Sequence, residues 1–152
     1  MAIIPLDSEH ASHCRERFDR LRPDSKRVWG SMSPTKVLAH LTFTLEMSLG
    51  EREVEGFGNF LTRNTFVWWL AVCVMPWPRG KLKAPDSFTP DPTGDFQAER
   101  TRCLAALDRF VAARTSEPNR TTYHPFCGDL ALRRWGYFHG RHLDHHLRQF
   151  GG

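Results

Sequence analysis

The chain lacks most of the sequence signatures that assign a chemistry directly. It contains no GxSxG, HExxH or GxGxxG motif and no P-loop, which excludes the familiar nucleophile elbow, the helical zinc-protease site and the glycine-rich phosphate loops. Its carboxylates are scattered, without an obvious pair for acid–base work. These signatures therefore identify no catalytic residue.

Long apolar runs and blocks of like charge are also missing. The longest apolar run, residues 66–77, contains Pro76, whereas a membrane span needs about twenty residues. The N-terminus lacks a basic segment followed by a long apolar core, so we expect no signal peptide. The net charge is +4, but the sequence has no basic stripe interleaved with aromatic residues of the kind that binds nucleic acid. We expect neither nucleic acid nor membrane as partner; the charge favours solubility or the approach of an anionic small molecule.

Cysteine is sparse and shows no pairing pattern. The four cysteines, at positions 14, 73, 103 and 127, are far apart and form no CxxC pair. Such spacing predicts reduced thiols and a cytoplasmic protein. Tyrosine is scarce as well: two tyrosines stand against eleven phenylalanines and five tryptophans, which indicates a core or pocket rich in aromatic surface.

The length of 152 residues, with 40% hydrophobic and 25% charged residues, is typical of one soluble domain spanning residues 1–152. Apolar residues at helical spacing predict five helices and no convincing strand. We expect these helices at about 8–21, 34–49, 59–74, 94–114 and 130–150.

Capping residues support two of the helix boundaries. Ser33 is a natural N-cap, Pro34 suits the first helical position and Gly50 is a natural stop, while Asp129 can cap the last helix. The third helix is apolar nearly all round, so we expect it to be the most buried. Residues 75–92 hold five of the ten prolines and predict a long loop, as do residues 115–128. The fold class predicted is all-α, a four-helix bundle with an additional helix and a long proline-rich loop.

Histidine is concentrated at the C-terminus, where four of the eight histidines fall within eight residues. His142 and His146 are four residues apart, which places them on one helical face. A projection at about 100° per residue puts His139, His142, His146 and Gln149 on the apolar side of the last helix, with His145 at its edge.

His40 projects into the apolar side of the second predicted helix, so two helices can bring three imidazoles together. Three imidazoles, without any carboxylate or thiolate, can bind a metal ion and leave a coordination position open. The alternative is a hydrogen-bonded core network that uses Thr44, Gln149 or backbone atoms, because buried polar rings need partners. The residues alone leave both arrangements open.

The remaining candidates are less specific. His10 and His13 lie among charged residues and should face solvent. His124 could line a pocket or serve a turn. Cys127 precedes a predicted helix N-terminus, where a thiolate would be favoured, but its apolar neighbours favour simple packing.

A histidine on the second helix followed by HxxxHxxQ on the last, here His40, His142, His146 and Gln149, resembles the DinB/YfiT-like superfamily. The closer resemblance is to a branch labelled a domain of unknown function. It is carried by RVWGSMSPTKVLAHL (27–41) and HPFCGDLALRRWGYFHGRHLDHHLRQFG (124–151), which cover a little over a quarter of the chain.

The resemblance implies a four-helix bundle in which His40, His142 and His146 bind a divalent ion, zinc or nickel. Gln149 or His139 would stand beside these ligands, although His139 lies outside the motif. Characterised relatives include thiol-dependent S-transferases and isomerases that use low-molecular-weight thiols. The resemblance therefore implies a metal-dependent transferase or hydrolase, most concretely one that transfers a thiol to a small electrophile. The alternative is a non-catalytic metal- or ligand-binding bundle that forms a homodimer through its apolar third helix.

Overall fold

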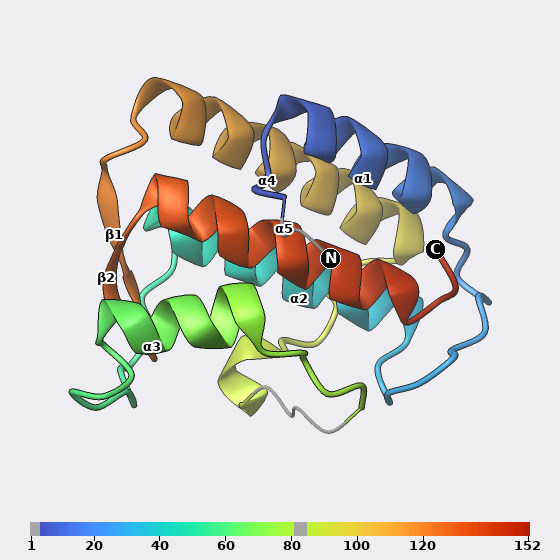
Figure 1. The fold of residues 1–152 in the computed structure, drawn as a ribbon. Helices are drawn as coiled ribbons and strands as arrows, with labels where there is room; N and C mark the ends of the chain where they lie inside the picture. The colour runs from blue at the N-terminus through green and yellow to red at the C-terminus, as the bar shows by residue number, and fades with distance from the viewer. Residues whose placement is uncertain (1–3, 81–84) are drawn as a thin grey trace.

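Four long helices form the body of the computed structural model, which describes residues 4–80 and 85–152 (Figure 1). They are α1 (Ser8–Arg20), α2 (Pro34–Leu49), α4 (Phe96–Ser116) and α5 (Leu132–Arg148). A short helix, α3 (Thr65–Trp69), continues into a π-helical turn, η1 (Leu70–Val74), and a 3-10 turn, η2 (Asp86–Phe88), precedes α4. Strands β1 (Thr121–His124) and β2 (Gly128–Ala131) form an antiparallel hairpin.

Local sequence explains where the long helices begin and end. The side chain of Asp7 accepts a hydrogen bond from the first turn of α1, and Asp95 does the same for α4. Ser33 is the N-cap of α2, Pro34 is its first residue and Gly50 ends it with a φ of 78°, a conformation that glycine adopts without steric cost. The predicted boundaries of α2 are confirmed.

The all-α fold class is wrong, because residues 121–131 form a two-stranded antiparallel sheet. Thr121 pairs with Ala131 and His124 with Gly128. Two threonines and a tyrosine favour an extended chain, and Gly128, with a φ of 74°, closes the turn. Each strand has four residues, too few to show a clear alternation of apolar and polar positions. In the described part of the chain the fold is a mixed one, five α-helices with a β-hairpin.

The hairpin also sets the start of α5. Asp129 lies within β2 and does not cap the helix; the N-cap is Ala131, without a side-chain hydrogen bond. The backbone N–H of Leu132 donates to the carbonyl of Arg120, and the next N–H donates to the carbonyl of Pro118. Tertiary contacts thus satisfy donors that a side-chain cap would otherwise serve.

The predicted third helix, 59–74, forms only over residues 65–74 and in part as a π-helix. The Asn59 side chain accepts backbone N–H groups of the next few residues and fixes a turn there, and Asn64 caps α3. The expectation that this segment is the most buried is also wrong. Trp68 and Val72 are buried, whereas Phe66 is 65% exposed.

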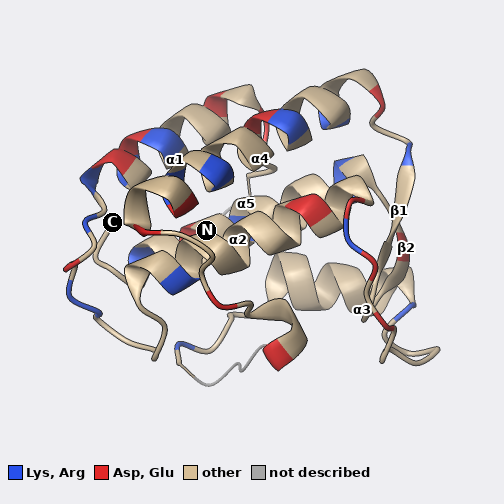
Figure 2. Cartoon of the chain, turned by 180° about the vertical axis from the view of Figure 1, so that it is seen from behind, with Lys and Arg blue, Asp and Glu red and all other residues tan. Residues whose placement is uncertain are grey.

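The hydrophobic core lies between the four long helices. Its largest fully buried side chains include Phe18, Leu38, Leu41, Leu45, Leu107, Phe110, Trp135 and Leu143. Figure 2 shows charged residues distributed along α1 and α4 and very few on α2 and α3. The low charge of α2 follows from its position, because its contacts with α4, α5 and β1 leave little of its surface to water.

Parts of two predicted segments lie outside the described residues: 1–3 of the N-terminus, where we expect no signal peptide, and 81–84 of the proline-rich loop. Among the helices of residues 4–80 and 85–152, none combines the length and the apolar character needed to cross a membrane.

Candidate metal centre

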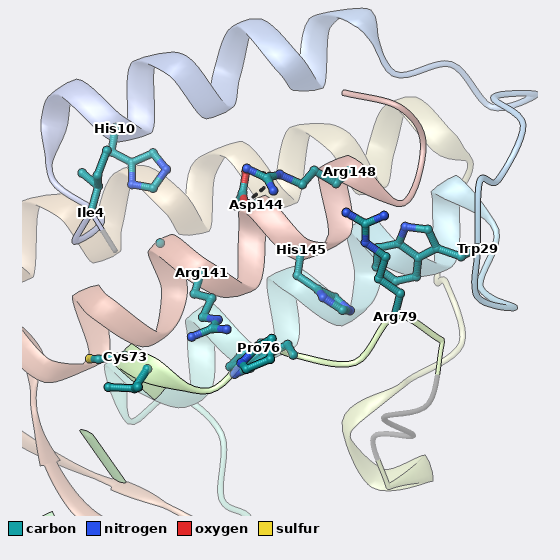
Figure 3. A pocket seen from close by; sticks show the side chains of 13 residues that line it. Ile4, His10, Trp29, Cys73, Pro76, Arg79, Arg141, Asp144, His145 and Arg148 are labelled. Atoms are coloured by element: carbon teal, nitrogen blue, oxygen red, sulfur yellow. Dashed lines mark hydrogen bonds and ion pairs between the residues drawn. The ribbon is translucent and has the colours of Figure 1, made fainter. Parts of the chain in front are cut away.

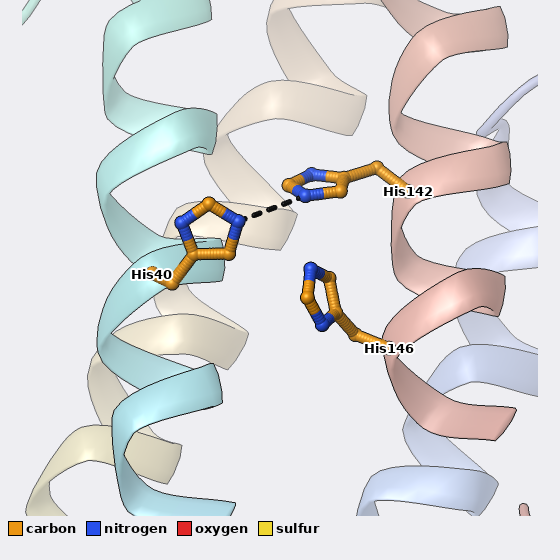
Figure 4. Close-up of side chains that lie close together, drawn as sticks. All are labelled: His40, His142 and His146. Atoms are coloured by element: carbon orange, nitrogen blue, oxygen red, sulfur yellow. Dashed lines mark hydrogen bonds between the residues drawn. The ribbon is translucent and has the colours of Figure 1, made fainter. Parts of the chain in front are cut away.

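Three buried histidines from two helices meet between α2 and α5 (Figure 4). His40 comes from the middle of α2, and His142 and His146 come from successive turns of α5. One ring nitrogen of each lies within 4.8 Å of the others, and none of the three residues is more than 6% exposed. The two helices therefore bring together the three residues that the sequence pattern selected.

In two of these rings Nδ1, the nitrogen that points away from the three-histidine group, donates a hydrogen bond to an acceptor of the chain. His40 Nδ1 lies 2.5 Å from the carbonyl oxygen of Phe88, in η2. Because a carbonyl only accepts, His40 carries a proton on Nδ1 and, when neutral, keeps a lone pair on Nε2. His146 Nδ1 lies 3.1 Å from Gln149 Oε1, which fixes that ring in the same tautomer. Gln149 is thus beside a candidate ligand, as its spacing predicted.

The third ring, His142, faces His40 with an Nε2–Nε2 separation of 3.0 Å. This separation fits either a hydrogen bond donated by His142 or two lone pairs directed at one cation. Two nitrogens that bind the same tetrahedral zinc lie about 3.3 Å apart. Thr44 Oγ1 makes a long 3.5 Å contact with His142 Nδ1 and donates its own proton to Leu41 O at 3.0 Å. It is therefore placed to accept from Nδ1, which favours a lone pair on Nε2.

Burial keeps these imidazoles neutral. Desolvation lowers the pKa of His40 in spite of its bond to Phe88. It lowers the pKa of His142 well below the ordinary value, and the neighbouring histidines lower it further. For His146, desolvation and then His40 bring the pKa to about 3. Neutral imidazole is the form that binds metal ions, so no proton has to be removed from these rings at neutral pH.

His139 lies outside the three-histidine group. It is fully buried, stacked on Trp135 at 5.4 Å between ring centroids, and its ring meets Phe110 edge-on at 4.7 Å. Within the described residues neither of its ring nitrogens has a hydrogen-bond partner. Desolvation lowers its pKa to about 3. Its environment is aromatic core rather than the surroundings of a ligand.

Three further histidines, His145, His13 and His10, differ in how far they are buried. His145 is half-buried and packs edge-on against Trp29 and Trp77, with ring centroids 4.5 and 5.7 Å away. His13 is exposed, as expected, whereas His10 is half-buried.

His124 combines the two roles that the sequence left open. At the end of β1, its Nδ1 accepts the backbone N–H groups of Phe126 and Cys127, both at 3.1 Å, so it stabilises the hairpin turn and carries its proton on Nε2. Desolvation lowers its pKa to about 4. It also lines the cavity onto which His40, His142 and His146 open.

A cavity of about 320 Å³ opens onto His40, His142 and His146. Its walls are mainly apolar and aromatic: Met32, Met47, Phe57, Val67, Trp68, Val72, Trp77, Phe88, Phe126 and Phe138. No Lys, Arg, Asp or Glu from residues 4–80 or 85–152 lines it. Cys127 lines it too, but burial raises the pKa of its thiol to about 11, so this residue is a protonated packing group at neutral pH, as its apolar neighbours predicted.

Sequence reasoning missed Phe88 and Trp77, which contact the histidines. Phe88 acts through its backbone carbonyl, which carries no residue-specific signal, and it approaches His40 from a segment 48 residues away. Trp77 contacts His142 and His145 from the proline-rich segment. The many aromatic residues indicated an aromatic pocket without identifying these two positions.

Comparison with protein-family models gives a match over residues 5–151 to the family described as "Protein of unknown function (DUF1569)". No curated protein matches the chain, and no solved structure does. The matched range includes both histidine-bearing helices and the hairpin.

Proposed function

The chain belongs to this family, and we propose that it is a divalent-metal-dependent enzyme whose ion is bound by His40, His142 and His146. The observation that carries the proposal is the convergence of three neutral imidazoles at an apolar cavity. In Figure 4 a ring nitrogen of each histidine is directed toward the space between the rings. Their outer nitrogens are oriented by groups of the chain itself.

The donor set fits zinc or nickel, both of which bind imidazole readily. Three neutral ligands cancel none of the charge of a divalent ion, and a tetrahedral ion keeps a fourth position open. When bound, such an ion supplies Lewis acidity and favours the deprotonated form of a thiol or water in that position. The Phe88 carbonyl and Gln149 hold two of the ligand rings in the binding tautomer, and the apolar walls exclude bulk water.

Within this proposal the reaction is transfer of a low-molecular-weight thiol to a small electrophile, and the chain is a DinB/YfiT-like protein. The support is the pattern of His40 followed by HxxxHxxQ, together with the finding that no activated nucleophile lines the cavity among residues 4–80 and 85–152. Because the Cys127 thiol has its pKa raised to about 11, the nucleophile has to arrive as a substrate. A cytoplasmic location belongs to the same proposal and is supported by the four free cysteines.

The first test is elemental analysis of protein purified without a metal-affinity tag. We expect close to one equivalent of zinc or nickel, or stoichiometric uptake on titration. Less than about a tenth of an equivalent, with no uptake, would contradict the proposal and would favour the hydrogen-bonded network, in which His142 donates to His40. The second test is turnover of thiols with electrophiles by the metal-loaded protein, with His142→Ala inactive.

The apolar cavity also favours a second candidate, a non-catalytic protein that binds a metal or an apolar ligand. Exposed Phe66 and Trp69 on α3, 65% and 47% exposed, support the homodimer expected with it. This candidate predicts no turnover by metal-loaded protein with any thiol and electrophile. It also predicts that His142→Ala lowers stability without affecting a reaction, and that analytical ultracentrifugation shows a dimer that Phe66→Asp dissociates.

A further inference from the structure

A second cavity, of about 430 Å³, adjoins the histidine cavity, and the two share Trp77 and His145 as lining residues. Figure 3 shows His145 between Arg141 and the neighbouring pair Arg79 and Trp29. We call this second space the arginine pocket. The rings of Trp77 and His145 pack edge-on with centroids 5.7 Å apart, and this pair forms the boundary that the two spaces share.

The two cavities differ in charge. Three arginines line the arginine pocket, at positions 79, 141 and 148, and its lining carboxylate is Asp144. Asp144 is already paired with Arg17 at 2.9 Å and with Arg148 at 3.0 Å. The arginine pocket therefore presents positive charge that its own carboxylate does not balance, next to a cavity that no charged residue of the described chain lines.

Arg141 is a cation held in place without a carboxylate partner. Its guanidinium donates to the backbone carbonyl of Val72 at 2.6 Å and to that of Met75, and it lies 5.2 Å from the ring centre of Trp77. Two carbonyl acceptors leave some of its five N–H donors for another group. Among the described residues no Asp or Glu lies within ion-pair distance of it, so its charge remains available to an anion.

Arg79 is the second such cation. It has no hydrogen bond and no carboxylate partner among residues 4–80 and 85–152. The next residue, Gly80, lies near Gly30: a Cβ added to Gly80 would stand 3.7 Å from the Gly30 nitrogen. Figure 3 shows Arg79 beside Trp29, whose ring packs on His145.

We propose that the arginine pocket binds the anionic group, a carboxylate or phosphate, of a small molecule whose other end lies in the histidine cavity. Planar guanidinium groups bind both anions through paired N–H donors. The linking part of the molecule would lie alongside the edge-on pair Trp77 and His145, which both cavities share. The substrate class is thus an amphiphilic small molecule, with one charged end and one uncharged end. The reactive role of the uncharged end rests on the proposed function; binding of the anionic end does not.

The test compares matched probes by quenching of tryptophan fluorescence, since Trp29 and Trp77 line the arginine pocket. For zinc-loaded protein we expect 6-mercaptohexanoate to bind about tenfold more tightly than 6-mercaptohexanol. Arg79→Gln should remove most of that difference and leave 6-mercaptohexanol binding unchanged. A phosphate analogue, 6-mercaptohexyl phosphate, shows which anion the pocket prefers, and a preference for either one supports the proposal.

The control variant is Arg22→Gln, which removes one cation from an exposed position that lines neither cavity. Equal affinities for the acid and the alcohol in wild-type protein would overturn the proposal. So would an equal loss of acid binding in Arg22→Gln and Arg79→Gln, which would indicate only a general effect of charge.

Hexanoate and hexanol, which carry no thiol, separate the two hypotheses. If hexanoate binding depends on Arg79 in protein that takes up no metal, the anion site stands and the proposed function fails. If metal binds but neither hexanoate nor 6-mercaptohexanoate depends on Arg79, the anion site fails and the metal centre stands.

Discussion

Two neighbouring turns of α5 bury a histidine each and surround it differently. His139 packs among aromatic rings and has no hydrogen-bond partner for either ring nitrogen in the described structure. His142 faces His40 with 3.0 Å between their Nε2 atoms and contacts Thr44 on its other side. Three residues turn a helix by about 300°, so the two side chains diverge by about 60°, one toward Phe110 of α4 and the other toward α2.

The difference shows that burial alone does not make a histidine part of a site. Desolvation lowers the pKa of both residues, and both are neutral at pH 7. What distinguishes His142 is the set of groups opposite it: another imidazole, a hydroxyl and a cavity. Metal binding, stability and pH dependence can each test this contrast.

The largest expected effect is the loss of metal affinity when a ligand is removed. His142→Ala should weaken zinc binding by more than about 100-fold, beyond the 10–100-fold typical of changes to residues that only support a ligand. His139→Phe, which keeps a ring in the same space, should leave the affinity unchanged. Competition titration with a chromogenic chelator measures both affinities. An equal loss of zinc affinity in the two variants would show that His142 and His139 do not differ in their contribution to metal binding.

The next effect is on thermal stability. Zinc at about 100 times its dissociation constant should stabilise the wild-type protein by about 2.7 kcal/mol, which corresponds to a rise of roughly 5–10 °C in Tm for a chain of this size. Scanning calorimetry with and without a chelator measures it. The rise should persist in His139→Phe and vanish in His142→Ala; an unchanged Tm in wild-type protein would contradict the metal centre.

A smaller loss is expected at Gln149, whose Oε1 lies 3.1 Å from His146 Nδ1. Gln149→Leu removes the acceptor and should reduce zinc affinity by about 10–100-fold. Gln149→Glu keeps an acceptor at this position and should retain most of the affinity. If both variants bound zinc like the wild type, Gln149 would be a packing residue alone.

The smallest effect is a pH dependence that belongs to His139. Its pKa is about 3 in the folded protein against 6.5 ordinarily, so the unfolded chain takes up a proton as the pH falls below 6.5 and the folded protein does not. Stability present above pH 6.5 is therefore lost toward pH 3. Between pH 7.5 and 5.5 this residue should account for about 1.4 kcal/mol of the loss.

Urea unfolding of metal-free protein at these two pH values measures that contribution. In His139→Phe the decline should be smaller by this amount, while the other buried histidines continue to contribute. An identical decline in wild type and variant would mean that His139 finds a polar partner in solution.

The sequence predicted those features that depend on neighbours along the chain. Ser33, Pro34 and Gly50 bound α2 because capping acts within one helical turn. The hairpin and the exposed, partly π-helical third segment were mispredicted. Four-residue strands are stabilised by pairing with each other, and an apolar run is buried only where another element covers it.

For the site, the sequence placed His142 and His146 on the inner face of one helix and Gln149 beside them, because helical geometry fixes spacings of three and four. It also made His40 a candidate. The tertiary structure alone decided that His40 meets them, that Phe88 orients His40, and that His139 faces aromatic rings instead. These outcomes depend on how α5 is rotated against α2 and α4, which the packing of the whole core sets and no local spacing encodes.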